Sequence, residues 1–149
     1  MDENFSIALP RAAYTVPVMR DFMGGALETK GVCEECLSDI LVATTEACAN
    51  VIDHGDPAPH YEVVARVRDG FCSLKIVHAG PKFDPASVPL PDPDSESGRG
   101  ILMMRELMDQ VSFGSDATKR TTVWMAKRLC ATRVSQLSLW QQPLATQQM

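Results

Sequence analysis

The sequence predicts a two-layer α/β sandwich in which a mixed, mainly antiparallel sheet carries its helices on one face. Apolar residues recur at helical spacing over 15–29 and 33–53, and alternating segments lie before and after them. The dipeptide Asp69-Gly70 separates two alternating apolar runs, which is the strongest short-range signal of a β-hairpin. Helical segments and strands are grouped rather than strictly alternating, as in a layered fold with helices segregated to one side of the sheet.

The N-terminal third contains one expected strand, over residues 4–9, and two expected helices. The first helix, 15–29, has an apolar stripe and ends at Gly31, a residue type that commonly terminates helices. The second helix, 33–53, has apolar residues every three or four positions, which are Cys33, Cys36, Leu37, Ile40, Leu41, Cys48, Val51 and Ile52.

The remaining elements follow from turn and breaker residues. We expect strands at 61–68 and 71–78, a helix at 100–109, and strands at 111–114 and 121–129. Residues 80–98 hold Pro81, Pro85, Pro89, Pro91 and Pro93 and are expected to form a lid-like loop. Residues 131–149 lack periodicity, so we expect one domain over 1–130 and a loose tail with Trp140 as a docking residue.

Composition excludes some classes of function. The 149 residues carry a formal net charge of −5 and no basic run, which argues against a nucleic-acid binder that depends on phosphate contacts. No apolar stretch approaches the roughly 20 residues of a membrane span. The first residues, MDENFSIALP, are acidic where a signal peptide would be basic. We therefore expect a cytoplasmic protein whose thiols are reduced.

Two of the five cysteines, Cys33 and Cys36, form a C-x-x-C pair. The sequence has no second such pair to complete a zinc site, so the pattern favours small apolar residues on one helix face. A thiol switch is the alternative. A disulfide between two residues about one helical turn apart would constrain the fold little.

A polar stripe runs along the second expected helix, because Asp39, Glu46, Asn50 and Asp53 share one face. A carboxylate at Glu46 can act as a general base for a hydroxyl or a water. The amide oxygen of Asn50, one turn further on, suits a hard cation such as Mg²⁺. A solvated helix face is the alternative interpretation of this stripe.

Two further segments contain residues suited to a phosphate or a base. Ser97-Gly98-Arg99-Gly100 stands at an expected helix start, where free N–H groups and the helix dipole attract anions. A flexible helix entry would have the same residues. The segment His78-Ala79-Gly80 directly follows an expected strand and precedes the proline-rich loop, and it is either part of a site or only a strand exit.

The order of these segments is more specific than any one of them. TEACANVIDHG, SGRGILMMRELMDQV and TTVWMAKRL together resemble the ATPase domain shared by histidine kinases, Hsp90, gyrase and MutL, the GHKL or Bergerat fold. The chain is most similar to the free-standing branch of that family, whose members are anti-sigma factors and serine-protein kinases. The resemblance runs from about residue 5 to residue 129.

The resemblance implies a site for ATP with Mg²⁺. It assigns Glu46 as the base that deprotonates a serine of a STAS-domain anti-anti-sigma factor, and Asn50 as the Mg²⁺ ligand. Gly98 and Gly100 correspond to the lid hinge at the phosphates, Arg99 adds charge there, and Thr121 and Thr122 lie behind the adenine. The expected nucleotide-binding set is Asn50, Asp53, His54, His78, Gly80, Gly98, Arg99, Gly100, Thr121 and Thr122.

Three positions depart from the family pattern. His78 replaces the aspartate that accepts a hydrogen bond from the adenine amino group, and Lys82 and Arg120 replace glycines. A lost polar contact in a nucleotide pocket costs about 1–3 kcal/mol. These departures favour a degenerate ATP site, whereas the intact Glu46 and Asn50 favour an active kinase, and the sequence leaves both interpretations open.

The expected function is regulation of transcription. The resemblance implies an anti-sigma factor that binds a sigma factor and/or a STAS-domain anti-anti-sigma factor, with phosphorylation of the latter as the alternative. Arg20 on the first helix is the expected partner-binding residue, and an ordinary exposed arginine is the alternative interpretation. We expect a homodimer that uses the sheet edge near the N-terminal strand, and neither nucleic acid nor membrane as a partner.

Overall fold

The computed structural model describes residues 3–54, 58–79, 96–115 and 120–130. Gly80, Lys82, Trp140 and the expected tail lie outside these residues. The elements, in chain order, are β1 (Glu3–Pro10), α1 (Thr15–Thr29), α2 (Glu34–His54), β2 (His60–Arg68), β3 (Phe71–His78), α3 (Glu96–Leu107), β4 (Gln110–Ser115) and β5 (Thr121–Arg128).

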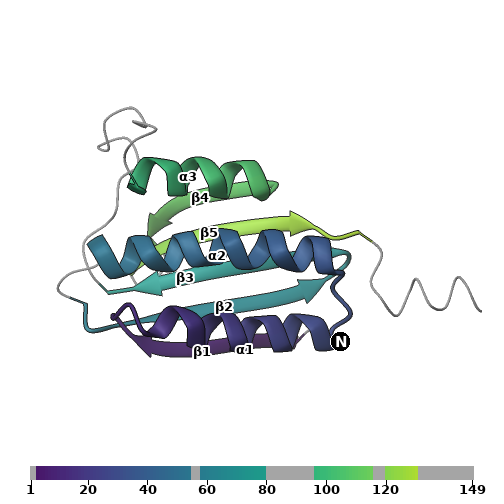
Figure 1. Cartoon of the computed structure of the whole chain (residues 1–149), viewed down its shortest axis with the longest axis horizontal. Coiled ribbons are helices and arrows are strands. Elements are labelled where there is room, and N and C mark those ends of the chain that lie inside the picture. The colour runs from purple at the N-terminus through teal and green to yellow at the C-terminus, as the bar shows by residue number, and fades with distance from the viewer. Residues whose placement is uncertain (1–2, 55–57, 80–95, 116–119, 131–149) are drawn as a thin grey trace, which may run out of the picture.

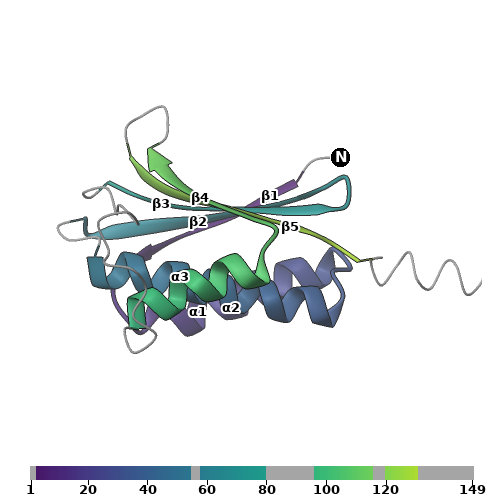
Figure 2. The ribbon, with the colours of Figure 1, turned by 90° about the horizontal axis from the view of Figure 1, so that it is seen from above.

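Five strands form a single sheet in the order β1-β2-β3-β5-β4, and α1, α2 and α3 cover one face of it (Figures 1 and 2). This confirms the two-layer fold. Every pairing among the described strands is antiparallel, where the sequence had suggested a mixed sheet. The reason lies in the connections. Two helices connect β1 to β2, and β2 runs back along β1. A single helix connects β3 to β4, but β5 lies between these two strands, so they do not pair with each other.

Residues with positive φ angles at two places in the chain explain how elements end. Asp69 (φ 52°) and Gly70 (φ 79°) form the two-residue turn of the β2–β3 hairpin, as the sequence predicted. Gly31 (φ 82°) ends α1, and its N–H donates to the carbonyl of Glu28 at 2.9 Å. Both positions need a residue that tolerates the left-handed region of backbone space.

The core lies between the helices and the covered face of the sheet. Met19, Met23 and Leu27 of α1 and Ile40 of α2 are fully buried there. One polar chain crosses the core: the Tyr61 hydroxyl lies 2.7 Å from Thr15 Oγ1, which donates to the carbonyl of Ala12. Burial raises the pKa of Tyr61 to about 12. Because the hydroxyl hydrogen of Thr15 is used in the bond to Ala12, the Tyr61 hydroxyl donates to Thr15.

Helix α3 begins at Glu96, four residues before its expected start at 100. Gly98 and Gly100 lie inside the helix rather than in a loop before it. Glycine lowers helix stability by about 1 kcal/mol per residue but does not forbid a helix. A prediction that starts the helix only after its glycines therefore places the first helical residue too late in the chain.

The cysteines also differ from expectation. A disulfide joins Cys33 to Cys130, 97 residues apart in sequence, whereas Cys36, Cys48 and Cys72 are buried free thiols. The expectation of reduced thiols is therefore wrong for this pair. Sequence spacing indicates only that Cys36 is close to Cys33, because the contact between Cys33 and Cys130 depends on the fold.

No helix among the described residues is long and apolar enough to cross a membrane.

Candidate nucleotide site

A cavity of about 370 Å³ lies between α2 and the first half of α3. It is lined by most of the polar residues that the sequence predicted to bind the phosphates and Mg²⁺. Its walls are formed by Glu46, Ala49, Asn50, Asp53, Arg99, Gly100 and Met103. Glu46, Asn50 and Asp53 of α2 share one helix face, which the spacing of the polar stripe predicted. Asp39, the fourth residue of that stripe, instead pairs with Lys127 at 3.3 Å.

Asn50 is the most deeply placed polar side chain of this cavity, with 8% of its surface exposed. Its amide Nδ2 is buried and has no hydrogen-bond partner among the described residues. A buried polar group without a partner costs about 1–3 kcal/mol. A bound group that supplies this partner would recover that free energy, so Asn50 marks the position where a polar ligand fits.

Glu46 lies directly against the backbone of α3. A Cβ atom added to Gly100 would be only 2.8 Å from Glu46 Oε2. The absence of a side chain at residue 100 therefore lets α3 approach the carboxylate. This close approach gives Gly100 a steric role in addition to the hinge role that the resemblance implied.

We expect Gly100→Ala to displace the Glu46 carboxylate without unfolding the protein. The clash falls on the end of a flexible side chain, and alanine gains about 1 kcal/mol of helix propensity over glycine. Because Glu46 forms part of the cavity wall, a displaced carboxylate would repel bound phosphates, and affinity for Mg²⁺ with inorganic triphosphate should fall roughly tenfold, measured by calorimetry. Gly25→Ala on α1 is the control, since a Cβ there meets nothing within 4 Å. Unchanged affinity in Gly100→Ala would contradict the steric role.

The side chains of the cavity fit a metal–phosphate group. Glu46, Asn50 and Asp53 offer carboxylate and amide oxygens, which are the ligands that Mg²⁺ prefers. Arg99 offers a guanidinium, which pairs well with phosphate oxygens. Asn50 and Asp53 would hold the cation, Arg99 would contact the phosphates, and Glu46 would remain available as a base.

A second and much smaller hollow, of about 10 Å³, lies on the expected adenine side. That volume is roughly the space needed for one water molecule. The hollow is lined by Asn50, Val51, His54, His78, Phe113, Thr121 and Val123. The hollow bounded by these described residues is thus much smaller than the cavity on the phosphate side. Asn50 lines both spaces and connects them.

The structure separates the two expected threonines. Thr121 lies opposite His78 in the β3–β5 register and lines the small hollow with it. Thr122 is fully buried but lines neither space, because successive residues of a strand point to opposite faces of the sheet. Gly98 lies in α3, and Gly80 is outside the described residues.

His78 is held in its neutral form. It is buried at the end of β3, and this burial lowers its pKa below 6.5, with the charge of Arg11 as a second cause. The Arg11 guanidinium donates to the carbonyl of Ile52 at 2.5 Å and to that of Ala58 at 2.8 Å. The residue that replaces the family's aspartate is therefore uncharged near neutral pH.

The lowered pKa of His78 predicts acid sensitivity. As pH falls below 6.5, the histidine of the unfolded chain binds a proton while the buried one does not. The unfolded state then binds more protons, so the free energy of unfolding decreases from pH 7 towards pH 5. We expect denaturant titrations of His78→Gln to show a weaker decrease than the natural chain. His60→Gln, at an exposed histidine, is the matched control variant.

Arg20, the expected partner-binding residue, is exposed on α1. Its Nη1 donates to Thr45 Oγ1 at 2.8 Å, and Thr45 directly precedes Glu46 on α2. Arg20 therefore lies on the flank of α1 that faces α2. A partner that contacts Arg20 would also be close to the helix that carries the candidate base.

Sequence reasoning missed several contributors to the site. Ala49 and Met103 form walls of the larger cavity, and Phe113 lines the small hollow. Ala49 had a detectable signal, since it lies three residues from Glu46 on the same helix. Arg11 had none, because its contacts with residues 52 and 58 depend on how β1 and α2 pack.

Comparison with known proteins identifies the class. Residues 9–127 match the family described as the histidine kinase-like ATPase domain, and the chain belongs to that family. It is 33% identical over 103 residues to an anti-sigma F factor of Geobacillus stearothermophilus, covering 63% of this chain and 70% of that protein. It is 25% identical over 127 residues to the serine-protein kinase RsbW of Halalkalibacterium halodurans, covering 77% and 78%.

A solved structure confirms the fold. The crystal structure of the RsbU and RsbW domains of a Mycobacterium tuberculosis protein superposes with a TM-score of 0.67 at 18% identity. The match covers 87% of this chain and 33% of that chain, so this protein spans about a third of its length. The resemblance to the anti-sigma and serine-kinase branch, stated from sequence motifs, is thereby confirmed.

Proposed function

We propose that this protein is a cytoplasmic anti-sigma factor that binds a sigma factor and/or a STAS-domain anti-anti-sigma factor. The observation that carries the proposal is the 33% identity to an anti-sigma F factor over 103 residues. Sequestration of a partner depends on surface and shape rather than on phosphoryl transfer. The proposed anti-sigma function therefore does not require that the adenine side of the site accept a nucleotide.

The second candidate is a protein-serine kinase that acts on the STAS-domain partner. The cavity that holds Glu46, Asn50 and Arg99 supports it. Bound ATP would supply the phosphoryl group. Glu46 would accept the proton of the attacking serine hydroxyl, Asn50 would hold Mg²⁺, and Arg99 would offset negative charge on the phosphates.

Calorimetric titration separates these two candidates. Mg-ATP, Mg-ADP and Mg²⁺ with inorganic triphosphate are titrated into the nucleotide-stripped chain and into His78→Asp. Equal affinities for ATP and triphosphate, with tighter ATP binding by His78→Asp, support a partner-binding protein with a degenerate base site. Binding of ATP by the natural chain that is at least tenfold tighter than binding of triphosphate contradicts the degenerate site and favours the kinase, which a phosphorylation assay on STAS-domain proteins then tests.

Partner binding tests the anti-sigma function directly. Purified sigma factors and STAS-domain proteins from the same genome are titrated against the chain, and inhibition of transcription is measured with each sigma factor. Arg20→Ala should weaken the productive complex. Arg68→Ala is the matched control, because Arg68 is exposed at the far end of β2 and pairs with Asp69 at 3.3 Å. No binding to any member of either class contradicts the proposal.

We further propose that two copies associate through α1 and the adjacent edge of the sheet. Tyr14, Val18 and Phe22 are spaced by four residues on one flank of α1 and are 67%, 45% and 38% exposed. Below α1 lies β1, an edge strand of the sheet (Figure 1). An apolar stripe beside an edge strand is suited to a symmetric contact.

We expect Val18→Asp to shift the chain from dimer to monomer, because a buried unpaired carboxylate opposes association. Sedimentation equilibrium of the full chain measures the change. Leu102→Asp on α3, where the leucine is 46% exposed, is the control and should remain dimeric. A natural chain that is monomeric at high concentration contradicts the proposed dimer.

A further inference from the structure

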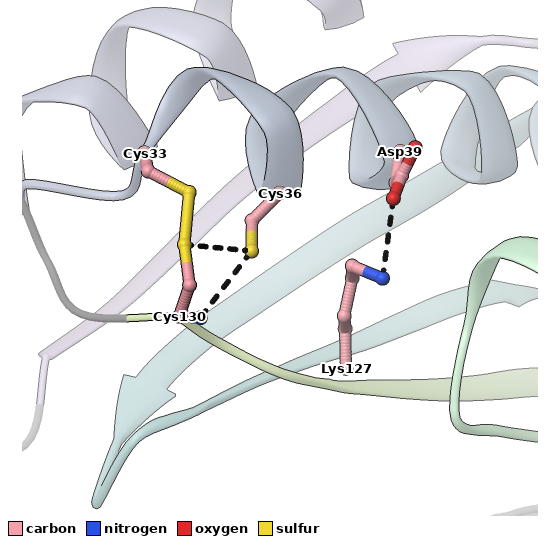
Figure 3. The surroundings of a disulfide bond; sticks show 5 residues. All are labelled: Cys33, Cys36, Asp39, Lys127 and Cys130. Atoms are coloured by element: carbon pink, nitrogen blue, oxygen red, sulfur yellow. Dashed lines mark hydrogen bonds and ion pairs between the residues drawn. A yellow bond between two sulfur atoms is a disulfide. The ribbon is translucent and has the colours of Figure 1, made fainter.

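Three cysteine sulfurs meet at one end of the domain (Figure 3). Cys33 precedes the first residue of α2, Cys36 lies in its first turn, and Cys130 follows β5. Their Sγ atoms all lie within 4.8 Å of one another, the only such group of His, Cys, Asp or Glu ligand atoms among the described residues. Cys36 and Glu46 are ten residues apart on α2, roughly 15 Å along its axis, so this cluster is separate from the nucleotide site.

We propose that the reduced cluster of Cys33, Cys36 and Cys130 binds a thiophilic divalent cation such as Zn²⁺. Thiolates select such ions, and a C-x-x-C pair with a more distant cysteine is a common arrangement of zinc ligands. Three protein ligands leave a fourth position, which a water molecule would fill. The Cys33–Cys130 disulfide is the oxidised, metal-free form of the same cluster.

The positions of the sulfurs fit this ion. Zinc–thiolate bonds of about 2.3 Å in a tetrahedron place two sulfurs about 3.8 Å apart. Cys36 Sγ already lies 3.5 Å from Cys130 Sγ. The Cα atoms of Cys33 and Cys130 are 7.0 Å apart, which leaves room for an ion between their side chains once the disulfide is reduced.

The surroundings favour thiolates and a cation. The carbonyl of Cys33 accepts the N–H of Leu37 at 2.8 Å, so Cys33 occupies the N-cap position of α2, where the helix dipole stabilises negative charge. The N–H of Cys130 donates to Cys36 Sγ at 3.4 Å. Glu34 and Glu35 add negative charge at the same helix end, and this charge attracts a cation. Cys36 is buried whereas Cys130 is exposed, so a fourth ligand can enter from solvent.

The chemistry balances in two steps. A phosphine reductant gives two electrons to the Cys33–Cys130 bond, and water supplies the oxygen of the resulting phosphine oxide and one proton for each freed sulfur. Zn²⁺ then replaces the protons of three thiols. Three Zn–S bonds form, three protons are released, and one water completes the coordination. Binding should therefore weaken as pH falls.

Cobalt titration of the phosphine-reduced full chain, under nitrogen, tests the proposal. We expect thiolate-to-cobalt charge-transfer bands at one equivalent of Co²⁺ and their loss on addition of Zn²⁺. Cys36→Ala and Cys130→Ala should each weaken binding on the order of 100-fold, since each removes one of three ligands. Cys48→Ala is the control, because Cys48 is a buried free thiol in the middle of α2.

Circular dichroism establishes that each variant is folded, and native mass spectrometry counts the bound metal. Two results would overturn the proposal. The first is a fully reduced natural chain that shows no charge-transfer bands with excess Co²⁺. The second is binding that Cys36→Ala and Cys130→Ala retain at the strength of Cys48→Ala. Either would leave the Cys33–Cys130 disulfide as a structural crosslink without a metal role.

Discussion

Asn50→Ala is expected to weaken binding of Mg²⁺ with inorganic triphosphate by about 100-fold, equivalent to about 2.7 kcal/mol. The substitution removes the amide oxygen that is suited to the cation. It also removes the buried Nδ2 that has no partner among the described residues. Because that unpaired group destabilises the empty site, the variant should be folded and at least as stable as the natural chain.

The measurement pairs calorimetry with thermal unfolding. Asn4→Ala is the control, since Asn4 is exposed on the edge strand β1 and does not line the cavity. Inorganic triphosphate has no adenine ring, so the measured affinity does not depend on His78. Affinity in Asn50→Ala within threefold of the natural chain would contradict the assignment of Asn50 to the metal–phosphate side.

Ile40→Ala is expected to lower the free energy of unfolding by about 2–5 kcal/mol. Ile40 is fully buried on α2, and its side chain belongs to the main core cluster. Truncation removes apolar burial and leaves a cavity that close-packed neighbours cannot fill. A loss of this size is a large share of the 5–15 kcal/mol typical of a whole domain, and much of the variant would be unfolded at modest denaturant concentrations.

Denaturant titration measures the loss. Leu102→Ala on α3 is the matched control, because it truncates a similar aliphatic side chain that is 46% exposed. It should change the free energy of unfolding by less than about 0.5 kcal/mol. A similar loss in both variants would mean that burial at Ile40 does not determine its contribution.

Elements with strong local signals were predicted well from the sequence. The bounds of α1 were predicted to the residue, and the hairpin turn at Asp69-Gly70 was correct, because stop and turn residues with positive φ mark them. The face of α2 that carries Glu46, Asn50 and Asp53 was also predicted, since helical spacing alone determines which residues share a face.

Features that depend on distant contacts were not predicted. The partner of Cys33 is 97 residues away, and the contacts of Arg11 with the end of α2 come from packing. The small size of the hollow beside His78 could not be inferred from residue types, because volume depends on how β3, β5 and α2 approach each other. Strand alternation, applied to Thr121 and Thr122, would have shown that only one of them faces the site.

The strand order has a consequence for how the chain reaches this structure. The β2–β3 hairpin closes through two residues, whereas the β1–β2 ladder pairs Pro10 with His60 across both intervening helices. Closing the longer loop costs more chain entropy before any contact is made. Pulse-labelled amides of β2 and β3 should therefore become protected early, and those of β1 only after α1 and α2 have docked.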